Sequence, residues 1–339
     1  MLRRASALLP WALGAVGAGL LAWVLWRIDY AAFRTALVGA NIWFVVLVPV
    51  TILFEQCVAA GKWKLLLATV GGARLSRVFA ASMAASLAGY VVPAVGSPVA
   101  RSWLVARSEG LKFTSVLASI AVDRTVDAAA FVVIAIAALL MIGLPQSGES
   151  LHTGVIAGVA GSLLMVALFA TLLMAFRLNV QGGGRGVHRL IFWLPARWRE
   201  RARPIIDQLA DGIAWPRSGG RASVIVLLAF CVKALAATHL LWAGLALGVQ
   251  LAISQYVLLM VLIGFLLVLG RFVRIPGTFV LAATFLLELH GVDRERALAM
   301  ALIVQVSATV SVAAVACVAL TWFGAELREL KAAYVVPDR

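Results

Sequence analysis

The most informative segment of the chain is Tyr90-Val-Val-Pro-Ala-Val-Gly-Ser-Pro-Val-Ala-Arg101. The apolar run that leads into it, residues 79–92, is 14 residues long, whereas a helix needs about 20 apolar residues to cross a bilayer. We therefore expect the segment to enter the membrane, break near Pro93 and Gly96, and return. Irregular backbone at membrane depth persists only where protein or a wet cavity satisfies its polar groups. The break thus predicts an internal cavity, and Arg101 is expected to face it.

Charged residues follow the break where the chain has become apolar again, at Asp123, Arg124 and Asp127. Residues four apart lie on one face of a helix, so the two carboxylates are expected on a common face, with Arg124 beside them. Two interpretations are open: the three residues form an ion-paired clamp that holds the broken segment, or they line a polar path. The position of Arg101 is also undecided between the cavity and the interface, because a long basic side chain can snorkel to the membrane surface.

Composition excludes an ordinary soluble domain. Of the 339 residues, 63% are hydrophobic and 13% are charged, which is typical of a polytopic membrane protein. The net charge of +14 does not call for a nucleic-acid partner, because the cytoplasmic loops of membrane proteins carry an excess of Lys and Arg. We therefore expect a membrane protein that binds no nucleic acid.

The apolar runs predict an all-α polytopic membrane protein with about six full transmembrane helices and two re-entrant broken hairpins. The full spans are expected at 8–26, 42–60, 128–144, 153–176, 222–249 and 297–323, and the hairpins at 79–106 and 256–287. We expect one integral membrane domain made of a first repeat (1–176), a basic amphipathic cytoplasmic linker (177–221) and a second repeat (222–339). A solvated connector is the alternative to a linker helix that lies on the inner leaflet.

The second broken hairpin repeats the pattern of the first. Its apolar run, 256–269, is interrupted by Arg271, Arg274, Pro276 and Gly277 before the chain becomes apolar again. Interrupted segments in corresponding positions of two halves point to a midplane transport site and to inverted repeats. The sequence therefore predicts a transporter with a pseudo-inverted repeat.

Loop charges predict that both termini are cytoplasmic. Most Lys and Arg outside the apolar runs, including those of 61–78 and 177–221, then fall on the cytoplasmic side, as the positive-inside rule requires. In a competing topology, 256–290 is a single excursion from the inner side and the C-terminus is external. Arg271 and Arg274 would then be ordinary cytoplasmic charges.

Charged residues inside the apolar regions are the candidate binding residues, because a charge at the bilayer centre costs about 2.5 to 3.5 kcal/mol on insertion scales. The basic candidates are Arg101, Arg124, Lys233, Arg271 and Arg274, and the acidic ones are Glu55, Asp123, Asp127 and Glu288. The set carries a surplus of one positive charge, and a guanidinium offers a fixed fork to phosphate. We therefore expect an anionic head group as the guest of the cavity.

The sequence leaves the ion-pair partners of Lys233 and Glu55 undecided. Lys233 lies deep in its helix and Glu55 is a candidate partner for it. Alternatively, Glu55 lies near the inner end of its own helix and meets Lys62 or Lys64. The histidines His239 and His290 are expected to be isolated core or interface residues.

Motifs of the common enzyme classes are absent from the sequence. No HExxH, GxSxG or GxxxxGK[ST] occurs, and no residue cluster has metal-ligand spacing. Asp123 and Asp127 could in principle work as an acid–base pair, but the adjacent arginine favours a salt bridge. We expect no cofactor, no metal and no ATP hydrolysis by this chain.

Two more motifs complete a pattern, Ala121-Val-Asp-Arg-Thr-Val-Asp127 and Lys62-Trp-Lys-Leu-Leu66. Together with 90–101 they resemble the flippase-like family, which includes the transmembrane region of bacterial lysylphosphatidylglycerol synthases. The resemblance implies a lipid translocase fold with two re-entrant elements and an internal cavity for an anionic or amphiphilic lipid. Within these 339 residues no soluble synthase domain is expected.

The chain departs from the family pattern at both hairpins. It has Ser97-Pro98-Val99 where many members carry an acidic residue before the arginine, and 274–281 contains no acid where the second half of the family usually has one. An anionic phospholipid, a polyprenyl lipid and a hopanoid lipid, the last because of the hopanoid-associated branch, are the candidate substrates.

The expected function is translocation of such a lipid between the leaflets of the bacterial inner membrane. Arg101 and Arg124 are expected to contact the head group, while Asp123 and Asp127 hold Arg124. A membrane enzyme that uses a lipid-linked donor and a non-transporting scaffold with a basic docking loop are the alternatives. Small residues at 158–162 could support helix contacts within one chain or in a homo-oligomer.

Overall fold

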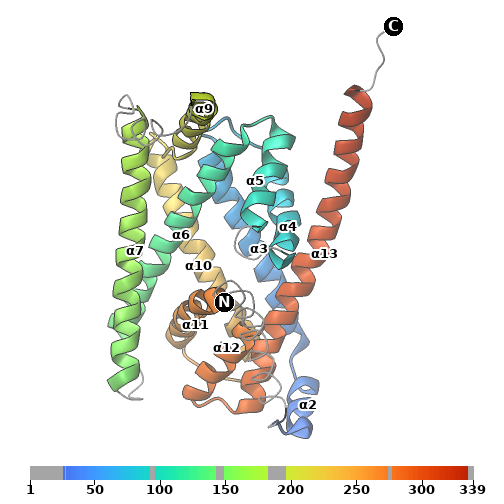
Figure 1. The fold of residues 1–339 in the computed structure, drawn as a ribbon. Coiled ribbons are helices and arrows are strands. Elements are labelled where there is room, and N and C mark those ends of the chain that lie inside the picture. Colours follow the sequence, from blue (N-terminus) through green and yellow to red (C-terminus); the bar gives the residue numbers. More distant parts are fainter. Residues whose placement is uncertain are drawn as a thin grey trace, which may run out of the picture. The chain divides into compact units, whose positions relative to one another are not determined.

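All regular elements in the described part of the chain are helices (Figure 1). The computed structural model describes residues 26, 28–91, 96–142, 149–181, 196–273 and 277–334. The helices are α2 (Tyr30–Val38), α3 (Ile42–Leu67), α4 (Leu75–Val91), α5 (Gly96–Glu109), α6 (Phe113–Ile142), α7 (Glu149–Gln181), α9 (Ala196–Gly212), α10 (Gly219–Ala246), α11 (Ile253–Val273), α12 (Thr278–Leu289) and α13 (Arg294–Tyr334). The predicted all-α class is confirmed.

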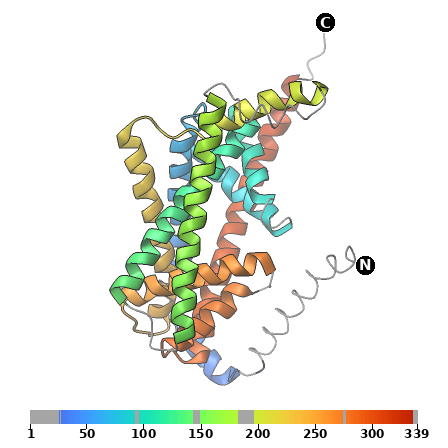
Figure 2. The ribbon, with the colours of Figure 1, turned by 60° about the vertical axis from the view of Figure 1, so that its left-hand side comes forward.

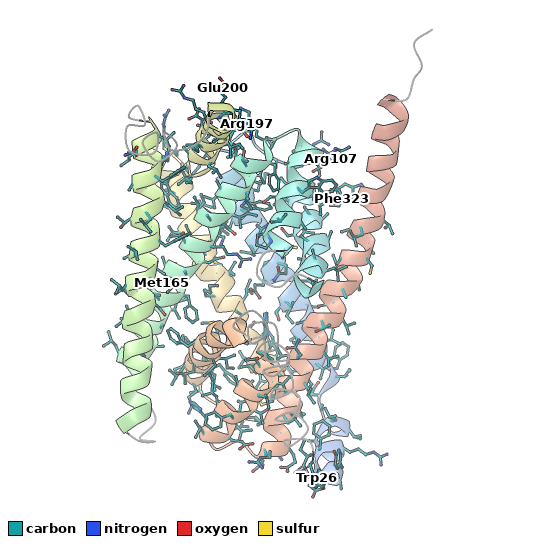
Figure 3. All side chains as sticks on the ribbon, in the orientation of Figure 1. Trp26, Arg107, Met165, Arg197, Glu200 and Phe323 are labelled. Atoms are coloured by element: carbon teal, nitrogen blue, oxygen red, sulfur yellow. The ribbon has the colours of Figure 1, made fainter. Side chains whose placement is uncertain are left out.

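Four described helical segments are long and apolar enough to cross a membrane. They are Ile42–Leu67, Ala160–Val180, Gly219–Ala246 and Arg294–Gly324. Apolar side chains on α7 remain uncovered, with Leu164 71% and Met165 70% exposed (Figure 3). Such surfaces are stable in contact with lipid rather than water, so the chain is a multi-pass membrane protein. The expected first span at 8–26 lies outside the described residues except for its last residue.

Each predicted broken segment is a pair of shorter helices that pack against each other. The first pair is α4 with α5 and the second is α11 with α12 (Figures 1 and 2). The region 79–106 is therefore not one straight helix. Gly96 begins α5, and Gly277, with φ of 73°, begins the second partner as the N-cap of α12, a backbone conformation that glycine adopts without strain. Pro93, Arg274 and Pro276 lie outside the described residues.

Several boundaries differ from the expected ones. α3 continues to Leu67 instead of ending at Ala60, so Lys62 and Lys64 are helical and not in a cytoplasmic loop. The charged stretch after Phe113 and the expected span 128–144 form one continuous helix, α6. Arg271 lies inside α11 rather than in the break that follows it. In each case a helix runs on through polar residues, because tertiary contacts can hold them where local hydropathy alone predicts an end.

The described helices form two compact units. The first unit comprises Met1–Glu55, Ala130–Leu163 and Val232–Thr309, and the second comprises Gln56–Ala129, Leu164–Cys231 and Val310–Arg339. The boundaries fall inside α3, α6, α7, α10 and α13, so these helices contribute to both units. Each unit contains one of the two helix pairs. The units are thus interleaved along the sequence.

The core of the second unit is built mainly by α3, α4, α5 and α6. Trp63, Leu66, Met83 and Val105 are buried in it, and Phe323 of α13 also belongs to it. Buried alanines of α4, namely Ala80, Ala81 and Ala84, leave room for close helix contacts, as small residues do in membrane proteins. This packing fixes α5 and α6, which carry the charged residues described below.

The core of the first unit lies around α11. Phe131 of α6 and Phe265 of α11 meet edge to face with ring centroids 5.4 Å apart. Gly264 is required at this contact, because a Cβ built there would lie 2.7 Å from the Phe131 ring, closer than a carbon contact allows. The aromatic pair therefore packs directly on the α11 backbone.

The described helix of the linker is α9, which is amphipathic and lies crosswise to α7 (Figure 2), whereas residues 182–195 of the expected linker lie outside the described residues. The partner of α9 is the start of α6: Thr114 and Ser115 both donate hydrogen bonds to Gln208, the second to the carbonyl oxygen at 2.9 Å. A Cβ at Gly212 would lie 2.7 Å from the Ala118 Cβ and would also meet the Ser115 carbonyl oxygen. Gly212 therefore allows α9 to dock on α6.

We expect Gly212→Ala to loosen α9 and to destabilise the second unit by about 1 to 3 kcal/mol, the usual cost of overpacking. The measurement is the apparent melting temperature of the purified protein together with the rate of proteolysis in the linker. Gly219→Ala is the matched control, because a Cβ at Gly219 meets no atom within 4 Å. Equal effects of the two substitutions would contradict the docking role of Gly212.

Candidate functional site

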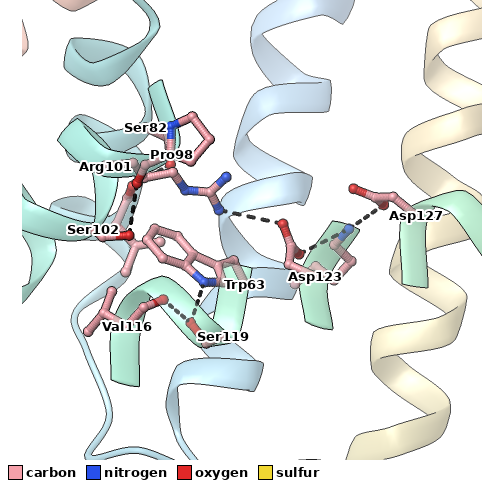
Figure 4. A network of polar contacts seen from close by, with 11 residues as sticks. Trp63, Ser82, Pro98, Arg101, Ser102, Val116, Ser119, Asp123 and Asp127 are labelled. Atoms are coloured by element: carbon pink, nitrogen blue, oxygen red, sulfur yellow. Dashed lines mark hydrogen bonds and ion pairs between the residues drawn. The ribbon is translucent and has the colours of Figure 1, made fainter. Parts of the chain in front are cut away.

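Four charged side chains from three helices meet in the second unit. Lys62 of α3 contacts Asp127 Oδ1 and places its Nζ 3.2 Å from Asp123 Oδ1. Arg101 of α5 places its Nη2 3.7 Å from Asp123 Oδ2. Figure 4 shows these contacts running from Arg101 through Asp123 to Asp127. We call these four residues the charged cluster.

The charged cluster is shielded from solvent. The side chain of Lys62 is 0% exposed, that of Asp123 5%, that of Arg101 12% and that of Asp127 17%. A buried charge is tolerated only where an opposite charge and hydrogen bonds compensate its lost hydration. Because Asp123 and Asp127 lie one helical turn apart on α6, a single ammonium group reaches both, and Lys62 joins α3 to α6.

The indole ring of Trp63 lies against the guanidinium of Arg101 and supports the charged cluster there. The guanidinium carbon lies 3.6 Å from the centre of the indole ring, a geometry in which a cation is attracted by the aromatic face. The indole Nε1 donates a hydrogen bond of 3.0 Å to Ser119 Oγ of α6 (Figure 4). Trp63 itself is 0% exposed. The orientation of Arg101 is therefore set by α3 and α6 together.

The expected clamp of Asp123 and Asp127 around Arg124 is wrong. Arg124 is exposed, and within the described residues it forms no ion pair with either carboxylate. One residue along a helix turns about 100° away from its neighbour, so Arg124 points off the face that carries both carboxylates. Lys62 takes the place expected for Arg124. Its only signal in the sequence was its membership of the Lys62–Leu66 motif.

The remaining candidates with described side chains lie in the first unit. The His239 Nε2 lies 3.4 Å from Glu55 Oε2 but takes part in no hydrogen bond with a described residue. Lys233 and His239 line a cavity of about 210 Å³ beside Phe131 and α11.

Glu288 is already paired with a basic residue and does not neutralise any of the candidate binding residues. It forms a two-pronged ion pair with Arg294, with Nε to Oε1 at 2.7 Å and Nη2 to Oε2 at 3.1 Å. The side chain of Arg271 and all of Pro93 and Arg274 lie outside what the structure describes, whereas Gly96 lies at the start of α5. The predicted site residues with described contacts thus fall into two groups, the charged cluster and the residues around the Lys233 cavity.

Metal-ligating side chains do not gather in the described ranges. No group of three or more His, Cys, Asp or Glu residues there has the geometry of a metal site. The polar site of the second unit is thus built from ion pairs, an aromatic ring and hydroxyl groups.

The helix pairs and the charged cluster define a class of polytopic membrane protein that has two helical hairpins and a buried polar site. Comparison with protein families then places the chain: it belongs to the family of the lysylphosphatidylglycerol synthase transmembrane region, whose sequence model matches residues 11–332. The resemblance found in the motifs is confirmed. No significant match was found among curated proteins or among solved structures. The family relates the chain to lipid handling or transport in membranes.

Proposed function

We propose that this protein is a lipid translocase that passes an anionic or amphiphilic head group beside Arg101 while the lipid tails stay in the bilayer. The observation that carries the proposal is a buried guanidinium with unused donors. Arg101 Nε is buried, and no described residue accepts a hydrogen bond from it. Its nearest carboxylate oxygen is 3.7 Å away, beyond ordinary hydrogen-bond distance.

Unused donors at a buried site are costly. A buried polar group without a partner costs about 1 to 3 kcal/mol, and more if it is charged. A phosphate or carboxylate guest would satisfy the guanidinium through two parallel hydrogen bonds. Arg101 therefore has a physical reason to attract an anionic head group into the second unit.

The charge balance favours the same guest. Within the charged cluster, Lys62 and Arg101 balance Asp123 and Asp127, and the exposed Arg124, which points off that face of α6, adds one more positive charge nearby. One positive charge is left over when all five groups are ionised. Asp123 also moderates the affinity of Arg101 for an anionic head group, because the head group must compete with the Asp123 carboxylate for the guanidinium. A site that binds weakly enough to release its guest is what transport requires.

The contacts of the two carboxylates favour transport over catalysis. A general base must reach a proton of the substrate, whereas Asp123 and Asp127 both form ion pairs with Lys62, although Asp123 Oδ1 accepts no hydrogen bond from a described residue. The charged cluster is suited to holding helices and binding a head group. A membrane enzyme with a lipid-linked donor is therefore the weaker alternative.

The membrane arrangement that we propose has six full spans and two re-entrant hairpins, α4 with α5 and α11 with α12. The pairing of these short helices supports it, since α5 has only 14 residues and a span needs about 20. We place the protein in the bacterial inner membrane with both termini in the cytoplasm, following the positive-inside rule. The cavity beside Lys233 gives the first unit a cationic site of its own.

We expect Arg101→Ala to slow lipid translocation at least about tenfold, because one charge-assisted interaction of roughly 1.5 kcal/mol or more is lost. The measurement uses proteoliposomes with fluorescent phosphatidylglycerol, polyprenyl phosphate or hopanoid lipids and a membrane-impermeant quencher. Arg107→Ala is the matched control, since Arg107 is an exposed arginine on the same helix. Unchanged transport of every lipid by correctly folded Arg101→Ala protein would overturn the proposal.

A further inference from the structure

A polar cavity in the second unit is lined by residues outside the charged cluster. Its volume is about 640 Å³, and it lies between the turn after α3, the start of α6, the last turns of α7 and the loop before α10. Its charged and aromatic lining consists of Lys112, Arg177, Asp211, Trp215, Arg217 and Arg221. We call it the basic cavity. None of these residues is part of the charged cluster.

Cationic side chains dominate the basic cavity. Four basic residues face a single carboxylate, that of Asp211. Across the described residues, none of the four forms an ion pair, and Arg177 donates a hydrogen bond of 3.2 Å to the Ile213 carbonyl oxygen. The α6 and α10 helices both begin here, with Phe113 and Gly219 as their first residues, and helix N-termini add partial positive charge. The cavity therefore selects an anion.

The depth of the basic cavity identifies the kind of anion. Three candidate spans end beside it: Ile42–Leu67 just before its lining residue Ala68, Ala160–Val180 around Arg177, and Gly219–Ala246 at Arg221. The ends of apolar spans mark the level of the lipid head groups. Trp215 is half-buried in the lining, and Trp is favoured at this interface. An anion at this level that also meets an indole and apolar side chains is a lipid head group.

We propose that the basic cavity binds the phosphodiester head group of an anionic phospholipid that stays associated with the protein. Basic pockets between transmembrane helices bind such head groups through their phosphate oxygens. Arg217 and Arg221 supply the guanidinium forks, and Lys112 and Arg177 supply the surrounding positive charge. This site is independent of the translocation proposed above, because it lies on other residues and does not require the lipid to cross the membrane.

The test is a thermal-stability titration of the purified protein in neutral detergent. The probes are short-chain phosphatidylglycerol, short-chain phosphatidylcholine and soluble glycerol phosphate at matched concentrations. Phosphatidylglycerol is expected to raise the melting temperature, since a ligand that binds only the folded state stabilises it. Phosphatidylcholine and glycerol phosphate are expected to have little effect, because the first lacks net charge and the second lacks the apolar anchor.

The matched variants are Arg217→Gln/Arg221→Gln in the lining and Arg197→Gln/Arg203→Gln on the exposed surface of α9. Figure 3 shows Arg197 near Glu200 on that helix. The first pair should weaken the apparent affinity for phosphatidylglycerol about thirtyfold, from two lost basic residues, and Arg217→Lys/Arg221→Lys should restore part of it. The second pair should keep the wild-type affinity. Retention of binding by the first pair, or equal loss in the second, overturns the proposal.

Two further results would contradict the proposal that the basic cavity binds an anionic phospholipid. An equal shift with phosphatidylcholine shows that the anionic head group is not recognised. An equal shift with glycerol phosphate shows that the basic cavity takes a soluble phosphate compound, and the lipid assignment is then wrong. Because Arg217 and Arg221 are exposed, their glutamine variants are expected to keep the melting temperature of the lipid-free protein, which separates lost binding from lost folding.

Discussion

Lys62→Met is expected to destabilise the protein by about 3 to 5 kcal/mol, the usual cost of removing one partner from a buried ion pair. The ammonium group of Lys62 is fully buried and contacts both Asp123 and Asp127. Methionine fills most of the same volume, so the loss reports charge rather than packing. Two carboxylates then compete for Arg101, the one cation of the charged cluster that remains. The measurement is the apparent melting temperature from size-exclusion chromatography after heating.

Lys64→Met is the matched control for this experiment. Lys64 lies two residues further along α3 and is exposed, so its removal should change stability by less than about 0.5 kcal/mol. The double variant Lys62→Met/Asp127→Asn should be more stable than Lys62→Met alone, because Arg101 and Asp123 are then left as a balanced pair. If the Lys62 and Lys64 variants melt together, or the second substitution restores nothing, the charged cluster does not hold α3 to α6.

Trp63→Ala is expected to have an effect of similar size, about 3 to 5 kcal/mol, as for other fully buried large aromatic residues. The indole is enclosed by the core of the second unit, donates to Ser119 and carries the Arg101 guanidinium on its face. Its removal leaves a cavity and takes away the support of Arg101. Translocation should therefore fall further than in a variant of equal stability without a change near Arg101. Melting temperature and translocation rate are both measured.

Two other substitutions separate the contributions of Trp63. Trp63→Phe keeps an aromatic face under Arg101 but loses the hydrogen bond to Ser119, and should cost about 1 to 3 kcal/mol. Trp103→Ala on α5 is the control, since Trp103 is 47% exposed and lies near Arg107 rather than Arg101. A Trp63→Ala protein as stable and active as Trp103→Ala would contradict the role assigned to this residue.

The stability of the charged cluster and the attraction of a guest draw on the same groups. Asp123 lies between Lys62 and Arg101, so a head group that binds Arg101 competes with Asp123 and leaves that carboxylate to Lys62. The helices α3, α5 and α6 stay neutralised during such an exchange. This arrangement explains how a buried arginine can be both held and available.

Local properties of the sequence determined the class of the protein and the position of its breaks. The length of an apolar run and the presence of Pro or Gly act over a few residues, and they predicted both helix pairs. The spacing of Asp123 and Asp127 also predicted that their carboxylates share a face. The family motifs added the relation to lipid handling, which the match over 11–332 confirms.

Only the tertiary structure decided which groups meet. Lys62 and Asp127 are 65 residues apart, and no local pattern states which helix packs beside which. Hydropathy predicted that α3 ends at Ala60, because an unpaired lysine in the membrane is unfavourable. The ion pairs that stabilise Lys62 come from α6 and are visible only in the tertiary structure. The contact of His239 with Glu55 and the docking of α9 on α6 through Gly212 have the same origin. Each depends on free energy gained between distant segments, which a sequence window does not contain.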